Sequence, residues 1–470
     1  MEGKLHPAQI WRYLTIGLVA GFIVGTVVNL SWYFSLVGCL VAGFLVWQAS
    51  SLRVFSWLAL GFLAAMFSAS LALVPPPASM FVGRQQFEAQ IVEPPRLSER
   101  ARRYVVEPSG WSAAYRILLT TKLYPKFNYG DILQVDCKQV ETITFGGYVT
   151  KGIWRQCSFP ELKFLSQAQP NLRQKLLQWR DLAGDRLRLL LPEPEASLAS
   201  SMLWGDDAGL PGELTAAFRR TGTSHLLAVS GYNVMILSEV LFSVLLALGL
   251  FRRQASLVVL VLVGLFVLFT GAEPPVVRAG IMGSLVIIGR LLWRKPDNLN
   301  LLLGSASAML LVAPRLIYDF GFQLSFAAMA GLLWLAQPLA GRLKFLPAAV
   351  GLREAASQTL AANITTLPLI LWRVDQLSLV GPVANLLIAP VVVVIFTFGL
   401  LVVLVSSIMG WSALPLAWPL AAALWYVRQI VESLSQLPGA VTHASWLAWL
   451  AVAVVYGGLA WWLKPKRLKL

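Results

Sequence analysis

The sequence predicts a polytopic α-helical membrane protein that carries a small extracytoplasmic β-domain. The chain has 470 residues, of which 57% are hydrophobic and only 13% are charged. A soluble chain of this length needs far more polar surface. Apolar runs of membrane-spanning length recur along the sequence, and one polar stretch of alternating residues, 80–165, interrupts them.

The N-terminal segment 1–79 is expected to hold three transmembrane helices. Each of its apolar runs is about long enough to span a bilayer: they lie near 11–30, 31–50 and 54–74. Lys4, Arg12 and Arg53 lie at the ends that the positive-inside rule places in the cytoplasm. Three crossings then place the following residues outside the cell.

Residues 80–165 are predicted to form an OB-like extracytoplasmic β-domain. Five alternating segments are separated by turn signals: QQFEAQIVE, RRYVVEP, YRILLTTKLY, DILQVDCKQV and IWRQCSFPEL. Five short strands in such a length are typical of a small barrel of the OB type. The stretch has 12 Lys and Arg against 8 Asp and Glu, with aromatic residues between them. That composition suits single-stranded nucleic acid, but aromatic residues also fill barrels, so a β-domain without a ligand is the alternative.

Two cysteines, Cys137 and Cys157, lie on predicted strands of this domain, whereas Cys39 lies in a predicted helix. In an oxidising compartment we expect a Cys137–Cys157 disulfide. Two buried free thiols are the alternative.

Residues 166–195 are predicted to form an amphipathic helix on the outer membrane surface. One helical stripe is apolar: it holds Leu172, Leu176, Trp179, Ala183, Leu187 and Leu190. The cations of the helix are Arg173, Lys175, Arg180, Arg186 and Arg188. A soluble helix packed on the β-domain is the alternative.

Residues 196–470 form the second polytopic region, which begins with a broken segment. The apolar pieces within 196–231 are too short to span a membrane, and charged backbone at membrane depth requires a protein or aqueous environment. Nine crossings are then predicted near 232–251, 256–273, 276–293, 299–313, 319–340, 354–372, 381–407, 412–431 and 446–463. The total of 12 places both termini in the cytoplasm, and the Lys/Arg distribution agrees for most loops.

The broken segment ends in TGTSHLLAVSGYNVMIL, with polar groups inside an apolar run. Ser224 and His225 are adjacent and do not form a local catalytic pair, and the sequence contains no GxSxG, HExxH or Walker A pattern. We therefore predict no catalytic residue, no metal site and no cofactor. Further along, Arg278 follows the break AEPP within an apolar helix, and Glu273 is its candidate partner.

Four ordered blocks resemble the ComEC competence family over nearly the whole chain. They are LPEPEASLASSMLWGDDAGLPGELTAAFRRTGTSHLLAVSGYNVMIL, PPVVRAGIMG, DNLNLLLGSASAMLLVAPRLIYDFGFQLSFAAMAGLL and NITTLPLILWRVDQLSLVGPVANLLIAP. The positions carried over by the match are His225, Ser230, Gly231, Arg278, Asp319, Gly321, Gln323, Ser325, Asn385 and Pro390. Where other members often have a leucine-histidine pair, this chain has Tyr232 and Asn233. Arg219 and Arg220 join the candidate channel wall because a phosphate chain needs fixed cations.

The resemblance implies a bacterial inner-membrane channel that admits single-stranded DNA to the cytoplasm during natural transformation. Its implied partners are single-stranded DNA, an extracytoplasmic DNA receptor with the uptake pilus machinery, a separate nuclease, and a cytoplasmic DNA translocase or single-strand-binding proteins. Many members continue into a metallo-β-lactamase-like domain, whereas this chain stops at Leu470, so we expect no nuclease and no ATPase activity here. The alternative is a small-solute secondary transporter, although the inverted repeats of such proteins are not visible in the sequence.

Overall fold

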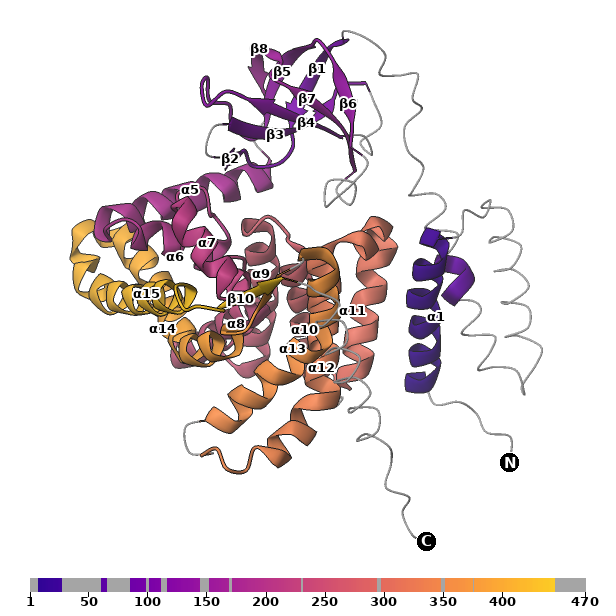
Figure 1. The fold of residues 1–470 in the computed structure, drawn as a ribbon, viewed down its shortest axis with the longest axis vertical. Helices are drawn as coiled ribbons and strands as arrows, with labels where there is room; N and C mark the ends of the chain where they lie inside the picture. The colour runs from indigo at the N-terminus through magenta and orange to yellow at the C-terminus, as the bar shows by residue number, and fades with distance from the viewer. Residues whose placement is uncertain are drawn as a thin grey trace. The chain divides into compact units, whose positions relative to one another are not determined.

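A computed structural model describes residues 7–27, 61–65, 85–98, 101–110, 116–143, 152–168, 171–229, 231–293, 297–347, 351–374 and 376–443. Most of the described secondary structure is helical, and an N-terminal β-sheet domain accompanies the helices (Figure 1). The chain divides into two compact units. One contains residues Met1–Asp185 and Gly231–Phe322, and the other contains Arg186–Ser230 and Gln323–Leu470.

The β-domain is one mixed sheet in the first unit. Its strands are β1 (Gln85–Ile91), β2 (Arg96–Ser98), β3 (Ala101–Pro108), β4 (Arg116–Thr121), β5 (Asp131–Cys137), β6 (Val140–Thr142), β7 (Ile153–Ser158) and β8 (Glu161–Gln167). All five predicted strand segments contain a strand. The order across the sheet is β6-β7-β4-β3-β1-β5-β8, with β2 paired to β3. The pairs are antiparallel except β4 and β7, which run parallel.

The predicted closed barrel is not confirmed, because no pairing joins the two ends of this sheet, β6 and β8, in the part of the chain that the structure describes. The two end strands explain the open edge. β6 has only three residues, and β8 is exposed along almost its whole length. Neither strand therefore offers a long apolar face that would favour closure.

The core of the β-domain is closely packed and contains both cysteines. Tyr104, Leu119 and Val135 are fully buried in it together with Cys137 and Cys157. The two cysteines are joined by a disulfide, with their Cα atoms 6.2 Å apart, which is within the usual range for such a bond. The bond links the end of β5 to β7.

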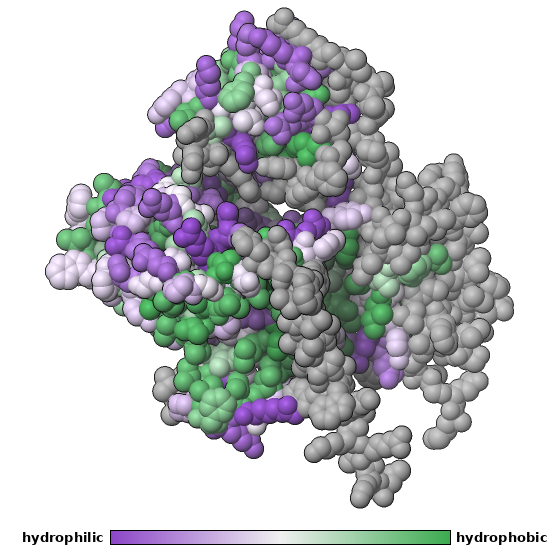
Figure 2. All heavy atoms as spheres, viewed as in Figure 1, coloured by the Kyte–Doolittle hydropathy of each residue, from purple (hydrophilic) through white to green (hydrophobic). Residues whose placement is uncertain are grey.

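Four segments among the described residues are long and apolar enough to cross a membrane. They are Arg252–Phe269, Pro274–Leu291, Phe320–Arg342 and Gly381–Ser435. Figure 2 shows extensive hydrophobic surface over helices and mostly hydrophilic residues over the strands. The predicted count of 12 crossings is not confirmed: two apolar helices are shorter, and the predicted crossings at 31–50 and 446–463 lie outside the described residues.

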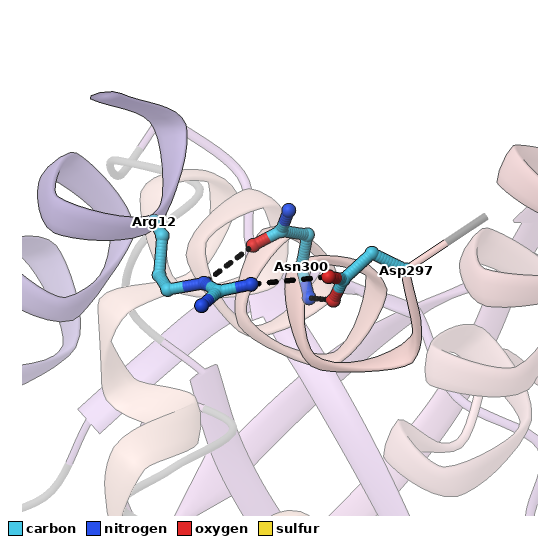
Figure 3. Close-up of polar contacts among 3 residues, drawn as sticks. All are labelled: Arg12, Asp297 and Asn300. Carbon is cyan, nitrogen blue, oxygen red and sulfur yellow. Dashed lines mark hydrogen bonds and ion pairs between the residues drawn. The ribbon is translucent and has the colours of Figure 1, made fainter. Parts of the chain in front are cut away.

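The first unit includes the helices α1 (Pro7–Val27), α8 (Gly231–Ala247), α9 (Arg252–Phe269), α10 (Pro274–Leu291) and α11 (Asn298–Val312), followed by the 3-10 helix η3 (Pro314–Tyr318). α8, α9 and α10 pack on one another, and α11 packs on both α10 and α1. A polar contact holds α1 to the start of α11 (Figure 3). The Arg12 guanidinium lies 3.0 Å from Asp297 Oδ2 and donates to Asn300 Oδ1 at 3.2 Å.

The second unit contains most of the other helices that the structure describes. They are α6 (Glu195–Trp204), α7 (Gly212–Arg220), the 3-10 helix η2 (Ser224–Leu226), α13 (Leu352–Val374), α14 (Gly381–Met409), the 3-10 helix η4 (Gly410–Ala413), α15 (Leu414–Ser435) and most of α12 (Phe320–Arg342). α14 and α15 pack side by side, and α6 contacts both of them. A small two-stranded sheet joins β9 (Gln376–Ser378) to β10 (Val441–His443).

The predicted amphipathic helix is α5 (Leu172–Leu190). Its predicted apolar stripe divides into two sets of residues. Leu176, Ala183 and Leu187 are buried in the protein and Leu190 is half-buried, whereas Leu172 and Trp179 are exposed, together with two further leucines, Leu182 and Leu189. Its location at the membrane surface stays a prediction.

Candidate functional site

The broken segment begins with α6, a short helix whose ten residues are all buried. Gly205 ends the helix in the left-handed conformation, and its N–H donates to the Ser201 carbonyl at 2.8 Å. The Ser201 hydroxyl in turn donates to the Leu227 carbonyl at 2.8 Å, which fixes the end of η2 against α6. A helix this short does not span a bilayer, but it provides a buried base for the polar residues that follow.

α7 presents two cations at its C-terminal end. Pro211 precedes the helix, and Leu214, Ala217 and Phe218 form its buried face. Arg219 and Arg220 lie in the last turn and are exposed. Neither forms an ion pair with another residue that the structure describes. The helix dipole favours cations at this end, and both guanidinium groups can bind an anion.

The chain turns sharply after α7. Thr221 caps the helix, and its hydroxyl contacts the Ala217 and Phe218 carbonyls. Gly222 has a φ of +67°, and a Cβ there would lie 2.9 Å from Ser378 Cβ. A residue with a side chain therefore fits neither the backbone nor the space. This packing places the turn beside Gly381, where α14 begins.

His225 follows in η2 and is exposed. Its imidazole is hydrogen-bonded to the Gly222 backbone, which holds the side chain against the turn after α7.

Gly231 and Arg278 meet in the first unit. Gly231 begins α8, and a Cβ placed on it would lie 3.0 Å from Arg278 Nη2 and 3.2 Å from Ala279 Cβ. Arg278, in α10, is only 7% exposed. The buried guanidinium thus occupies the space beside a residue without a side chain.

Asp319 precedes α12, whose start lies close to the starts of α8 and α10. Its carboxylate accepts the Phe322 backbone N–H at 2.8 Å and so caps α12. A Cβ on Gly321 would lie 3.9 Å from the ring of Pro275, and Pro275 O lies 4.0 Å from the Cβ position of Gly231. The starts of α8, α10 and α12 therefore converge around Pro275. Three positions that the sequence singled out separately, Gly231, Arg278 and Asp319, belong to this group.

The other predicted positions are distributed over several helices. Asn233 is buried in α8, Gln323 and Ser325 are half-buried in α12, and Asn385 is half-buried one turn into α14. Pro390 is exposed within α14, and Ser230 lies outside the described residues.

One charged pair was not predicted from the sequence. Glu195 Oε1, at the start of α6, lies 3.2 Å from Arg428 Nη2 on α15, and only 7% of the Glu195 side chain is exposed. The sequence feature that could have indicated this pair is Arg428, a lone arginine in the predicted crossing 412–431. Its partner is far away in the sequence, so spacing alone does not reveal the pair.

The profile of the family described as "Competence protein" matches residues 202–469. The match covers more than half of the chain and includes α7, η2 and all of the helices from α8 to α15. The chain belongs to the competence protein family. No solved structure gives a significant match to this family member.

Three relatives are similar to this competence family chain over part of their length. "ComE operon protein 3" of Bacillus subtilis (strain 168) is 30% identical over 285 residues, which are 59% of this chain and 34% of that protein. An "Uncharacterized protein" of Aquifex aeolicus (strain VF5) is 30% identical over 264 residues, 55% of each chain. "Uncharacterized protein YcaI" of Escherichia coli (strain K12) is 26% identical over 338 residues, 63% of this chain and 43% of that one. The matches thus span about a third to just over half of the relatives' length.

Proposed function

We propose that this chain forms a transmembrane channel through which single-stranded DNA enters the cytoplasm during natural transformation. Membership of the competence protein family and the four candidate spans support the proposal. The proposed arrangement is multi-pass in the bacterial inner membrane, with about 12 spans, cytoplasmic termini and the OB-like domain outside. In this proposal a separate nuclease degrades the second strand, and the motive force comes from a partner or an ion gradient.

The observation that carries the proposal is the exposed pair Arg219 and Arg220 at the end of α7. A phosphate chain that leaves water loses its counterions, and fixed cations must replace them. Contacts that permit movement must be repeated and weak, so exposed side chains suit a path better than a deep pocket. The short α6 and α7 belong to a broken segment, which is tolerated at membrane depth when it lines a wet cavity.

The second group, Gly231, Arg278 and Asp319, has a different proposed role. We assign it to the framework of the channel wall, because Arg278 is buried against Gly231 and the Asp319 carboxylate caps α12. In this assignment, loss of Arg278 lowers the amount of folded protein, because removal of a buried charge disturbs its packed surroundings.

The experiment is Arg219→Gln/Arg220→Gln in a transformable host. We expect normal membrane abundance and reduced entry of labelled DNA into a DNase-resistant pool, because the substitution removes two cations without touching the buried face of α7. Arg252→Gln/Arg253→Gln is the matched control, since it removes two adjacent exposed arginines at the start of α9. Normal uptake at normal abundance in the Arg219/Arg220 variant would exclude the pair from the route.

A further inference from the structure

Cationic side chains and exposed aromatic rings lie at one end of the β-sheet. The register aligns Arg103 with Thr120 and Thr120 with Ser158, so β3 begins where β4 and β7 end. Gln139, just before β6, lies at the same end because Val140 pairs with Cys157. The chain segments that leave these strands form a rim, which consists of Arg102, Arg103, residues 122–126, Lys138 and Phe159.

The rim contains two rings that the fold does not bury. Tyr124 is 71% exposed and Phe159 is 61% exposed. They follow β4 and β7, which are neighbouring parallel strands, so the two rings emerge from adjacent positions of the sheet. Other aromatic residues of the domain, such as Tyr104 and Phe127, pack inside the core. Tyr124 and Phe159 therefore do not contribute to this core and leave two neighbouring rings open to a partner.

The segment that carries Tyr124 is anchored at both ends. Thr121 belongs to β4, and the Phe127 ring is buried 6.0 Å from the Tyr104 ring in an edge-to-face contact. The Phe127 backbone N–H donates to the Tyr104 hydroxyl at 3.1 Å. Between these anchors all five residues, Lys122 to Lys126, are exposed. The segment 122–126 is thus held at both ends while its side chains are exposed to solvent.

Phe159 is held in an unfavourable backbone conformation. Its φ is +53°, in the left-handed region that residues other than glycine rarely adopt, at a cost of about 1–2 kcal/mol. The Phe159 N–H donates to the Thr120 carbonyl at 2.7 Å, which fixes this geometry. Strain of this kind persists where the surroundings impose it, and it is enriched at binding sites. Here it holds an exposed ring in place.

The positive charge of the rim favours an anionic ligand. Five cations belong to the rim: Arg102, which is half-buried, and the exposed Arg103, Lys122, Lys126 and Lys138. Lys126 Nζ lies 5.4 Å from the centre of the Tyr124 ring. Among the described residues, three carboxylates lie near these strand ends: Asp136, which accepts a hydrogen bond from Gln86, Glu141 and Glu161. Cations beside exposed rings match a strand whose phosphates alternate with unpaired bases.

We propose that this rim is a docking site for single-stranded DNA, with bases stacked on Tyr124 and Phe159 and phosphates against the surrounding cations. A lipid surface is the competing partner, because aromatic residues and lysines also occur at membrane interfaces. The rim fits a nucleic acid better, since its exposed aliphatic side chains are limited to Leu123 and Pro125 beside five cations. The proposal concerns binding and does not depend on the channel.

The test is fluorescence anisotropy of a labelled oligonucleotide with the full chain in nanodiscs. Tyr124→Ala/Phe159→Ala should weaken binding at least about tenfold, because stacking contributes roughly 1–3 kcal/mol per base. Phe164→Ala is the matched control, since Phe164 is an exposed ring on the edge strand β8. Lys122→Gln/Lys126→Gln should lower the slope of log affinity against log salt by about 1.4, whereas Arg252→Gln/Arg253→Gln should not.

The outcomes separate the alternatives. Unchanged affinity in the Tyr124/Phe159 variant would overturn the proposal, whatever the uptake experiments show. An environment-sensitive dye on Phe159→Cys should stay water-exposed in nanodiscs without DNA. A blue shift under that condition would assign the rim to the lipid surface instead. Loss of uptake in the Arg219/Arg220 variant with intact oligonucleotide binding would show that docking and passage are separate steps.

Discussion

At the scale of single residues, Gly231 allows the start of α8 to lie against the Arg278 guanidinium. We predict that Gly231→Ala destabilises the folded protein by about 1–3 kcal/mol, because the added methyl group overpacks a buried contact. The distance that decides this is 3.0 Å from the Cβ position to Arg278 Nη2. Thermal unfolding of the purified protein in detergent measures the effect.

Gly283→Ala is the control for this prediction. Gly283 lies in α10, the helix that carries Arg278, and a Cβ there would meet nothing within 4 Å. Alanine favours the helix more than glycine does, so the control should unfold at the same or a higher temperature. Equal unfolding temperatures for Gly231→Ala and the wild type would contradict the packing described here.

The sequence identified these residues one by one but not their contact. Gly231 and Arg278 were each singled out by a local pattern, a glycine in a broken helix and a cation in an apolar one. Their contact depends on how α8 packs against α10, which local patterns do not encode. A Glu273–Arg278 ion pair, which the spacing favoured, stays a prediction. Glu273 is the residue that precedes α10.

At the scale of elements, the Glu195–Arg428 pair joins α6 to α15. We predict that Arg428→Gln destabilises the protein by about 2–5 kcal/mol, because it leaves the buried Glu195 carboxylate without its partner, and that Glu195→Gln costs less, because Arg428 is half-buried. The double variant should lose less than the sum of the two. A double-mutant cycle on unfolding free energies measures the coupling.

The exposed pair Arg188–Glu193 is the control for that cycle. Its atoms are 3.7 Å apart, and the side chains are 42% and 52% exposed. Solvent screens such a pair, so we expect a coupling below about 1 kcal/mol. Similar coupling energies for the two pairs would mean that Glu195–Arg428 does not hold α6 in place.

Most elements were predictable because glycine and proline mark their ends. The predicted crossings at 276–293 and 381–407 correspond to α10 and α14, each of which has a proline in its first turn. β8 was missed because it follows β7 after only Phe159 and Pro160 and does not alternate between buried and exposed residues. The sheet order depends on long-range pairing, above all the parallel pair β4 and β7, and the sequence contains no signal for it.

At the scale of the whole molecule, the topology that the sequence predicts stays a prediction, and two sets of contacts bear on it. α8, α10 and α12 are all expected to begin outside, and their starts converge around Pro275. The starts of α1 and α11 are both expected inside, and Arg12 binds Asp297 between them (Figure 3). The topology prediction itself rested on the number of crossings and on the distribution of lysine and arginine.

The topology prediction is tested by cysteine labelling. Ser109→Cys is a suitable probe of the outer side, because Ser109 lies in an exposed turn after β3. In a Cys39→Ser background we expect a membrane-impermeant maleimide to label Ser109→Cys in intact cells. Arg253→Cys should react only after permeabilisation, because the start of α9 is predicted inside. The reverse labelling pattern would show that the predicted topology is inverted.

Entry of labelled DNA into a DNase-resistant pool tests the central claim most directly. Cells that lack the gene should bind DNA at their surface at the normal level but should accumulate no protected label. Expression of the chain should restore entry of one strand. Protected label at the normal level in cells without the gene would contradict a role as the channel for DNA.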